Sequence, residues 1–251
     1  MDRLAELASE LHDADGTVAL TGAGISVPSG IPPFRGDGGI WGEQFDPAAF
    51  HIRRFERDPA GFWTDRLELH DAMRPPDVEP NAGHDALSTL EREGFLDAVV
   101  TQNTDGLHTE AGSRRVVELH GNAERVVCSR CGENAAADPV RQRVRDGENP
   151  PRCDCGGVWK PDVVLFGEQL DPATLTEARE LAEGSDVFLA IGSSLQVEPA
   201  ASLPLTAARG GTLAVVNLEE TSADGQAEYV FRRDVTDVLP ELVRAVEALD
   251  A

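Results

Sequence analysis

The feature that most constrains the fold is a set of short, mostly apolar runs without alternation of polar and apolar side chains. A strand with one face in water alternates, whereas a strand buried on both faces is apolar throughout. Helical patterns separate the runs, at residues 81–92, 173–182 and 239–249. The sequence therefore predicts an α/β fold with a Rossmann-like, doubly wound parallel sheet. The predicted strands are residues 17–21, 96–100, 116–119, 162–166, 187–191 and 213–216.

All four cysteines lie in one polar stretch, as a Cys-x-x-Cys pair and a Cys-x-Cys pair. Cys128 and Cys131 are followed after 21 residues by Cys153 and Cys155. Paired thiolates suit tetrahedral zinc, which stabilises small inserts that lack a core of their own. Two disulfides or a redox pair are the alternatives, and the absence of an export signal argues against disulfides. Four thiolates leave no open coordination position, so we predict one structural Zn²⁺.

Two stretches interrupt the strand and helix pattern and divide the chain. Residues 36–79 are rich in glycine, proline and aromatic side chains, and residues 124–157 contain the cysteines. We expect residues 1–35, 80–123 and 158–251 to form the Rossmann-like domain. The two interruptions would form a smaller module, made of a helical and loop insert (36–79) and a zinc-binding ribbon (124–157).

A glycine-bearing turn follows the first predicted strand. Gly22 and Gly24 form a Gly-x-Gly motif, which in doubly wound folds brings backbone N–H groups close to a pyrophosphate. Position 27 is valine, so the third glycine of the usual dinucleotide fingerprint is absent. A tight structural turn therefore remains an alternative. Further along, Arg35 could pair with a phosphate and Phe34 could cover a reactive face, unless this is an ordinary surface loop.

Polar side chains follow two more of the predicted strands. Ligands bind outside the carboxyl ends of parallel strands, where Asn103 and Asp105 are expected to lie. An asparagine suits a carboxamide, and an aspartate can hold a hydroxyl or a developing cation; helix capping is the alternative. His120 ends another predicted strand and fits a general base of near-neutral pKa, although a lone histidine is often structural.

Composition excludes several classes of function. The chain has 45 acidic and 22 basic residues, a formal charge of −23, which argues against direct nucleic-acid binding. No apolar run reaches the roughly 18 residues of a membrane span. Met1 begins a polar helical segment rather than a signal core. We therefore expect a cytoplasmic protein without a membrane partner, and a monomer.

The basic residues are one lysine, Lys160, and 21 arginines. An acidic excess with almost no lysine keeps a surface hydrated and is typical of proteins that work in concentrated salt. Codon drift in a GC-rich genome is the alternative.

Taken together and in this order, the motifs resemble the sirtuin family of NAD-dependent protein lysine deacylases, of archaeal or bacterial type. The resemblance extends from residue 17 to about residue 240. It rests on residues 22–35, 101–108, 118–121, the four cysteines, and residues 161–168, 192–195 and 216–217.

The resemblance implies that NAD and an acyl-lysine protein substrate meet in a cleft between the two parts of the chain. It assigns catalysis to His120, Asn103 and Asp105. The implied substrate-binding residues are Trp63, Arg66, Val163, Phe166, Gly167, Glu168 and Val197. The implied NAD-binding residues are Gly22, Ala23, Gly24, Val27, Phe34, Arg35, Gln102, Asn103, Thr104, Asp105, His120, Gly192, Ser193, Ser194, Asn217 and Val235.

The activity implied by the resemblance is removal of acetyl groups from lysine, with release of nicotinamide and O-acetyl-ADP-ribose. Thr104 departs from the isoleucine that is usual in the family. Trp63 and Arg66 have the spacing of a Tyr/Arg pair in members that remove acidic acyl groups, so succinyl or malonyl removal is one alternative. Mono-ADP-ribosyl transfer, a non-catalytic binding module and a simple oxidoreductase are the others.

Overall fold

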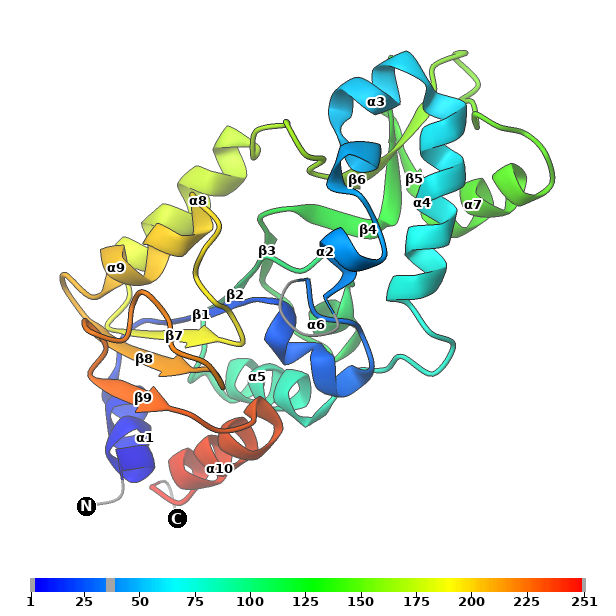
Figure 1. Ribbon diagram of the computed structural model, residues 1–251. Helices are drawn as coiled ribbons and strands as arrows, with labels where there is room; N and C mark the ends of the chain where they lie inside the picture. The colour runs from blue at the N-terminus through cyan, green and yellow to red at the C-terminus, as the bar shows by residue number, and fades with distance from the viewer. Residues whose placement is uncertain (1–2, 35–38, 250–251) are drawn as a thin grey trace.

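The large sheet is parallel, as the sequence predicts, and has six strands (Figure 1). Five of them correspond to predicted apolar runs, and the sixth, β9 (Tyr229–Phe231), is a short edge strand that the sequence analysis did not predict. The structure is a computed structural model that describes residues 3–34 and 39–249. All five pairings between neighbouring strands are parallel. In sheet order the strands are β3 (Val116–Glu118), β2 (Ala98–Thr101), β1 (Thr17–Thr21), β7 (Val187–Ile191), β8 (Thr212–Val216) and β9 (Tyr229–Phe231).

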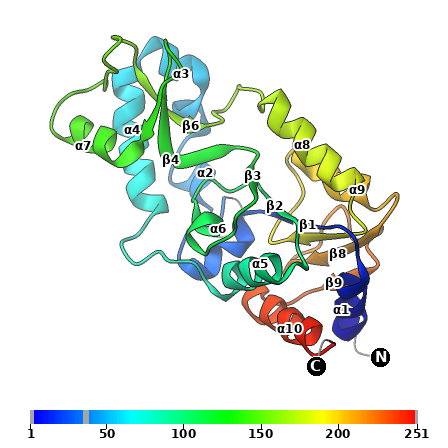
Figure 2. The same ribbon diagram turned by 180° about the vertical axis from the view of Figure 1, so that it is seen from behind.

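Helices cover both faces of this sheet, so successive strand residues enter two different cores (Figures 1 and 2). Ala19 and Leu189 pack with one group of helices, whereas Leu20 and Phe188 pack with the other. The first group is α1 (Arg3–Asp13), α5 (Ala82–Glu93) and α10 (Val235–Glu247), and the second is α8 (Pro172–Glu183) and α9 (Leu203–Ala207). Burial on both faces explains why the strands lack alternation.

The strand order places a topological switch point between β1 and β7. The chain proceeds from β1 to β2 and β3 on one side, and from β7 to β8 and β9 on the other. At such a point the two connecting loops diverge and leave a crevice at the carboxyl ends of the strands, where ligands bind in open α/β sheets. The fold therefore predicts a ligand site beside the loops that follow β1 and β7.

A second, antiparallel sheet forms the centre of the smaller module. Its strands, in sheet order, are β5 (Asn134–Ala136), β4 (Gly121–Cys128) and β6 (Trp159–Val163). The strand predicted at residues 162–166 is observed at residues 159–163 and belongs to this small sheet instead of the large one. The reason is its partner: β6 pairs with β4, and from Val164 onward the chain turns away as a loop. The domain boundaries remain a prediction. β4 crosses the boundary predicted at residue 124, and β6 begins after the boundary predicted at residue 157.

The two insertions pack against each other and share one apolar core. The sequence instead predicts a zinc-binding insert that lacks a core of its own. Phe62 and Trp63 of the helical insert are buried against Val126 and Trp159 of the small sheet. Trp63 Nε1 also donates to the Trp159 carbonyl at 2.7 Å. The insert contributes α2 (Ile40–Glu43), α3 (Ile52–Arg57) and α4 (Pro59–Met73), and α7 (Ala137–Arg145) follows β5. The remaining short helices are α6 (Leu107–Glu110), η1 (Ala23–Ile25), η2 (Val27–Ser29), η3 (Pro47–Phe50) and η4 (Ala200–Ser202).

The four cysteines converge at one end of the small sheet, with their sulfur atoms within 4.8 Å of one another. The Sγ atoms of Cys128 and Cys155 are 3.5 Å apart, and those of Cys131 and Cys153 are 3.8 Å apart. Four sulfurs at about 2.3 Å from one zinc ion, at tetrahedral angles, would lie about 3.8 Å from one another. The thiols therefore fit one structural Zn²⁺, far from the crevice of the large sheet.

None of the helices in the described part of the chain combines the length and apolar character needed to cross a membrane.

We predict that each chain holds one zinc ion whose removal destabilises the smaller module. Cys131→Ser removes a thiolate ligand, so we expect less than one zinc per chain and a lower melting temperature. Ser129→Ala, between the first two cysteines, is the matched control and should keep its zinc. Metal analysis and thermal unfolding make the measurement. A wild-type protein that keeps its melting temperature after zinc is removed would contradict the assignment.

Candidate active-site cleft

A cleft with a volume of about 1060 Å³ lies between the large sheet and the smaller module. Its walls are the loops after β1, β2, β7 and β8, together with the segment that follows β6. Many predicted site residues line it: Gly22, Ala23, Gly24, Val27, Phe34, Arg66, Gln102, Asn103, Thr104, His120, Val163, Phe166, Gly167, Glu168, Gly192, Ser193, Ser194, Val197, Asn217 and Val235. Residues from eight separate stretches of sequence thus meet around this cleft.

Glycines allow the loops after β1 and β7 to touch. Gly24 N–H donates to the Gly192 carbonyl at 2.8 Å. A Cβ atom on Gly24 would lie 2.8 Å from Gly192 Cα, closer than side-chain carbons approach backbone. Gly192 itself has φ +58°, a conformation that favours glycine. The Gly-x-Gly motif therefore has a packing role at the floor of the cleft, and it leaves the backbone uncovered for a ligand.

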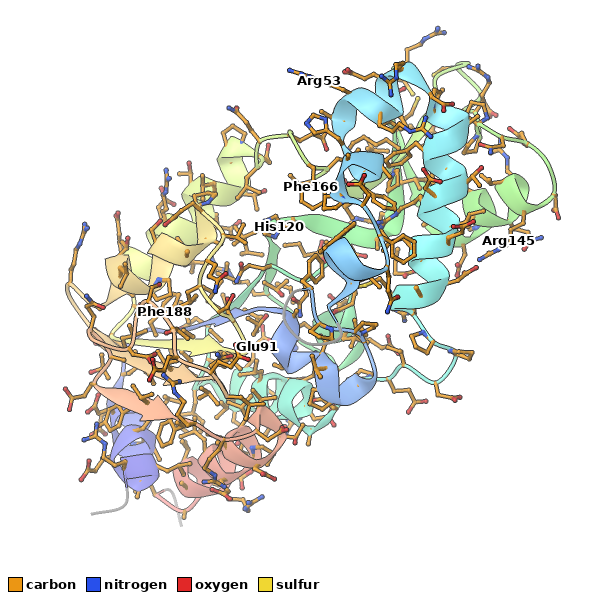
Figure 3. The ribbon with its side chains drawn as sticks, in the orientation of Figure 1. Arg53, Glu91, His120, Arg145, Phe166 and Phe188 are labelled. Carbon is orange, nitrogen blue, oxygen red and sulfur yellow. The ribbon has the colours of Figure 1, made fainter. Side chains whose placement is uncertain are left out.

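His120 lies where the two sheets meet, at the end of β3 and directly before β4 (Figure 3). Its Nδ1 is 2.9 Å from the Gln102 carbonyl oxygen. A carbonyl can only accept, so Nδ1 carries the proton and Nε2 is the basic nitrogen of the neutral ring. Burial lowers the pKa of His120 from its usual value, and the bond to Gln102 partly opposes that shift. The ring is therefore neutral near pH 7, as a general base must be.

The other histidines around this region are poor candidates for that role. His84 and His108 are buried, and their ring centroids are 4.9 Å apart. Burial lowers the pKa of His84 to about 4 and that of His108 to about 3. Neither is among the described residues that line the cleft. His120 is thus the histidine that combines access to the cleft with a defined tautomer.

A hydrogen-bonded chain connects the predicted residues Asn103 and Asp105. Asn103 Nδ2 donates to Ser26 Oγ at 3.1 Å, and Ser26 Oγ donates to Asp105 Oδ2 at 2.8 Å. Asp105 does not itself line the cleft in the described part of the chain. Burial raises the pKa of its carboxyl, while hydrogen bonds from Leu107 and Ser26 oppose that shift. Asp105 is therefore connected through Ser26 to the Asn103 amide, which lines the cleft.

Ser26 is a candidate site residue that the motif analysis did not single out. It follows the Gly-x-Gly turn by two positions, and it is 1% exposed. A small hydroxyl directly after such a turn was the available signal, but its partner lies 79 residues away in sequence. Only the parallel pairing of β1 with β2 brings the two together.

Three further predicted residues differ in their placement. Trp63 is 1% exposed within the small-module core, so it is packed away from the cleft. Arg66, one turn further along α4, does line the cleft. Burial lowers the pKa of its guanidinium to about 10. Arg35 lies outside the described residues.

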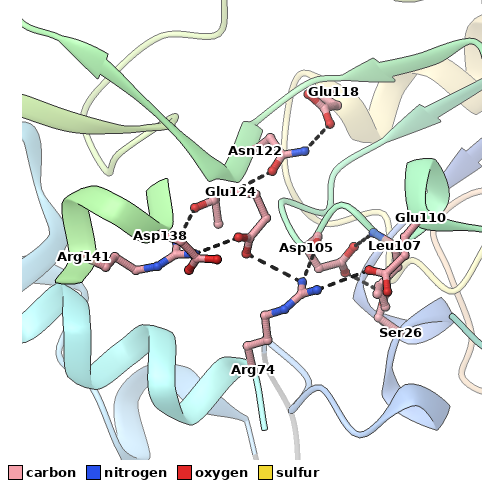
Figure 4. Close-up of polar contacts among 11 residues, drawn as sticks. Ser26, Arg74, Asp105, Leu107, Glu110, Glu118, Asn122, Glu124, Asp138 and Arg141 are labelled. Carbon is pink, nitrogen blue, oxygen red and sulfur yellow. Dashed lines mark hydrogen bonds and ion pairs between the residues drawn. The ribbon is translucent and has the colours of Figure 1, made fainter. Parts of the chain in front are cut away.

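A network of arginines ties the smaller module to the loop after β2 (Figure 4). Arg74, at the end of α4, donates to the Asp105 carbonyl at 2.8 Å and lies 3.2 Å from Glu110. Glu124 bridges Arg74 and Arg141, with N–O separations of 3.7 Å and 2.8 Å. Arg141 is 4% exposed and the Glu124 side chain is 32% exposed, so their pairing is partly shielded from water. The network holds the wall of the module in register with Asn103.

The cleft fits a dinucleotide by its size and its donors. Ligand pockets usually measure about 300–1,000 Å³, so 1060 Å³ accommodates a large ligand. Gly22 and Gly24 offer bare backbone at the switch point, and Asn103 offers an amide suited to a carboxamide. Gln102 donates to Ser193 at 2.9 Å, which links the loops after β2 and β7 across the site. Such an arrangement can hold a nucleotide along the sheet edge with its reactive end beside His120.

Known proteins support this interpretation. The model of the Sir2 family matches residues 22–199 of the chain. The NAD-dependent protein deacetylase of Haloarcula marismortui is 57% identical over 245 residues, which covers 96% of this chain and 94% of that protein. The corresponding enzyme of Saccharolobus solfataricus is 43% identical over 243 residues, with 96% of both chains covered.

Solved structures agree with the sequence relatives. A structure described as a Sir2–p53 peptide–NAD+ complex has a TM-score of 0.84 and 37% identity, with 98% of both chains covered. Another, from a study of the mechanism and regulation of Sir2 enzymes, has a TM-score of 0.86 and 42% identity, with 99% of both chains covered. The family match, the relatives and the geometry of the cleft lead to one assignment: this chain belongs to the Sir2 family, the sirtuins.

Proposed function

We propose that the chain removes acetyl groups from lysine side chains of proteins in an NAD-dependent reaction. The observation that carries the proposal is His120, whose Nδ1 is fixed by the Gln102 carbonyl so that Nε2 is the base at a cleft fit for a dinucleotide. The relatives named NAD-dependent protein deacetylases, which match the chain over nearly its whole length, support it. Acetyl-lysine, NAD and one water give lysine, nicotinamide and O-acetyl-ADP-ribose.

The residues around the cleft have distinct tasks in this reaction. NAD, when bound, supplies the ribose to which the acetyl group passes as nicotinamide leaves. His120 Nε2 accepts the proton of the attacking ribose hydroxyl, and burial keeps the ring neutral for that purpose. Phe34, 37% exposed at the cleft, excludes water from the reacting centre. Asn103, held by Ser26, orients the carboxamide end of the nucleotide.

The peptide would bind as an added strand between two segments that line the cleft. One comprises residues 163–168, and the other is residues 195–197, of which Gln196 and Val197 line the cleft. Backbone pairing supplies affinity with little dependence on sequence, so substrates of varied sequence can share the site. The acyl-lysine side chain would then extend toward His120. We propose Val163, Phe166, Gly167, Glu168 and Val197 as peptide-binding residues on these grounds.

Further properties of the chain are also proposals. The charge of −23 supports a protein adapted to concentrated salt that does not bind nucleic acid directly. A cytoplasmic location and a monomeric state remain expectations from the sequence.

The identity of the products tests the proposal most simply. Incubation with NAD and an acetyl-lysine peptide should give a peptide lighter by one acetyl group and an acetylated ADP-ribose, both detected by mass spectrometry. A succinyl-lysine peptide should turn over more slowly. Faster removal of succinyl would favour an acidic-acyl enzyme with Arg66 as carboxylate ligand. A peptide that gains ADP-ribose would instead indicate mono-ADP-ribosyl transfer.

We predict that the acid limb of the activity profile reports His120. Falling pH protonates the base and stops the reaction, and the pKa of His120 lies below its usual 6.5. The midpoint in kcat/KM should therefore fall below pH 6.5. In His120→Ala the limb should vanish and activity should drop by about 10²–10⁴-fold, the usual contribution of a general base.

His12→Ala on α1 is the control for this experiment, since it removes an imidazole far from the cleft. It should keep both the rate and the acid limb of the wild-type protein. An acid limb that persists in His120→Ala, or a wild-type midpoint above 6.5, would contradict the assignment of the base.

We also predict that salt stabilises the fold. At a charge of −23 the folded chain repels itself, and raising salt from about 0.1 M to about 1 M shortens the screening length from about 10 Å to about 3 Å. The melting temperature should therefore rise as KCl is added. Equal stability across that range would refute salt adaptation.

A further inference from the structure

Lys160, the one lysine of the chain, is held inside the protein rather than at its surface. It lies on β6, beside the cleft, and its side chain is 14% exposed. Its Nζ lies within hydrogen-bond distance of three oxygens. They are the Val163 carbonyl at 2.8 Å, the Pro161 carbonyl at 3.3 Å and Glu168 Oε2 at 2.9 Å.

The Glu168 carboxylate connects Lys160 to the loop that follows β6. The oxygen that faces Lys160 also accepts from Leu165 N–H at 2.8 Å. Glu168 N–H in turn donates to the Leu165 carbonyl at 2.9 Å. These two bonds close a turn over residues 165–168, and all four of its residues line the cleft. The turn is therefore shaped by one carboxylate, and among the described residues Lys160 is its cationic partner.

The turn has further contacts that hold its beginning and middle. Val164 N–H donates to the His120 carbonyl at 2.9 Å, and Ile52 N–H donates to the Phe166 carbonyl at 3.0 Å. Glu168, at the far end, depends on Lys160 for its charge partner. Loss of Lys160 should thus disturb the end of the turn while the His120 end remains in place.

The geometry explains why a lysine occurs here in a chain that otherwise uses arginine. Twenty-one of the 22 strongly basic residues are arginine. An ammonium is a compact point charge with three donors, which matches three oxygens that converge on one atom. A planar guanidinium spreads its donors over a fork and cannot converge on them in the same volume. Arginine at this position would keep the positive charge but would not bring one nitrogen within hydrogen-bond distance of all three oxygens.

We propose that Lys160 is a positioning residue for the acyl-lysine peptide, which it serves by fixing the turn at residues 165–168 through Glu168. The inference rests on the proposed function, because it assigns that turn to one wall of the peptide site. Lys160 does not touch the substrate. Its effect is to keep the backbone of the turn in the conformation that the incoming strand pairs with.

Steady-state kinetics of the zinc-loaded full chain test the proposal. Lys160→Met should raise the KM for an acetyl-lysine peptide by about tenfold or more, as expected for loss of hydrogen bonds to a charged group. The KM for NAD should change less than about twofold, since the polar partners of Lys160 Nζ in the described part of the chain all belong to residues 161–168 and none to the loops after β1 or β7. Lys160→Arg should recover only part of the loss. Glu168→Gln should mimic Lys160→Met, and the double variant should be no worse than either.

Arg115→Met is the matched control, because it also removes one cation from an ion pair. Arg115 pairs with Glu177 at 3.3 Å in an exposed position before β3. Its peptide KM should equal that of the wild-type protein. A peptide KM for Lys160→Met no different from that of Arg115→Met, or an equal rise in the KM for NAD, would overturn the proposal.

Chemical acetylation gives a second test that does not need enzyme activity. Acetic anhydride has one lysine to modify in this chain, so mass spectrometry of the peptide that contains residue 160 reports it alone. Lys160 should react about tenfold faster in Glu168→Gln than in the wild-type protein, because its charge partner is lost. Equal rates would show that Glu168 does not hold the lysine. A wild-type protein without deacetylase activity would refute the proposed function. The acetylation rates would still test the Lys160–Glu168 contact, because they do not depend on enzyme activity.

Discussion

The close approach of the two sheets at His120 is the constraint on which the site depends. β3 of the large sheet leads through His120 directly into β4 of the small one, and the His120 carbonyl accepts from Val164 beyond β6. Gly121 has φ +74°, and a Cβ atom there would overlap the Asp162 carbonyl. The imidazole that we propose as the base, the loops proposed to hold the nucleotide and the segment proposed to bind the peptide thus share one short junction. A shift in the small module would move the base relative to all of them.

Contacts outside that junction also limit how the smaller module can move. Arg74 connects the end of α4 to the loop that carries Asn103 and Asp105, and Arg141 connects α7 to Glu124 of β4, which also pairs with Arg74. Because Arg141 is buried, this pairing is less exposed to screening by salt than a surface ion pair. Zinc closes the far end of the same small sheet. Arg74, Arg141 and the four cysteines do not line the cleft in the described part of the chain, so they support the site by holding the smaller module in place.

Sequence alone predicted the large sheet well, because strands buried on both faces produce a pattern that survives without any contact information. It also predicted that residues such as Gln102, Asn103 and His120 lie at the carboxyl ends of strands. The smaller module was harder, since its core joins Trp63 to Trp159 across 96 positions. Ser26 was missed and Asp105 was expected in the cleft for the same reason. Spacing identifies a residue's chemistry, whereas its orientation depends on partners far along the chain.

The central claim is that a dinucleotide lies in this cleft with its nicotinamide-bearing ribose beside the basic nitrogen of His120. A crystal structure of the chain with NAD and an acetyl-lysine peptide measures this directly. The account predicts that His120 Nε2 lies about 3 Å from a hydroxyl of that ribose, while Nδ1 keeps its bond to the Gln102 carbonyl. A nucleotide bound elsewhere, or an Nε2 turned away from the ribose, would contradict it.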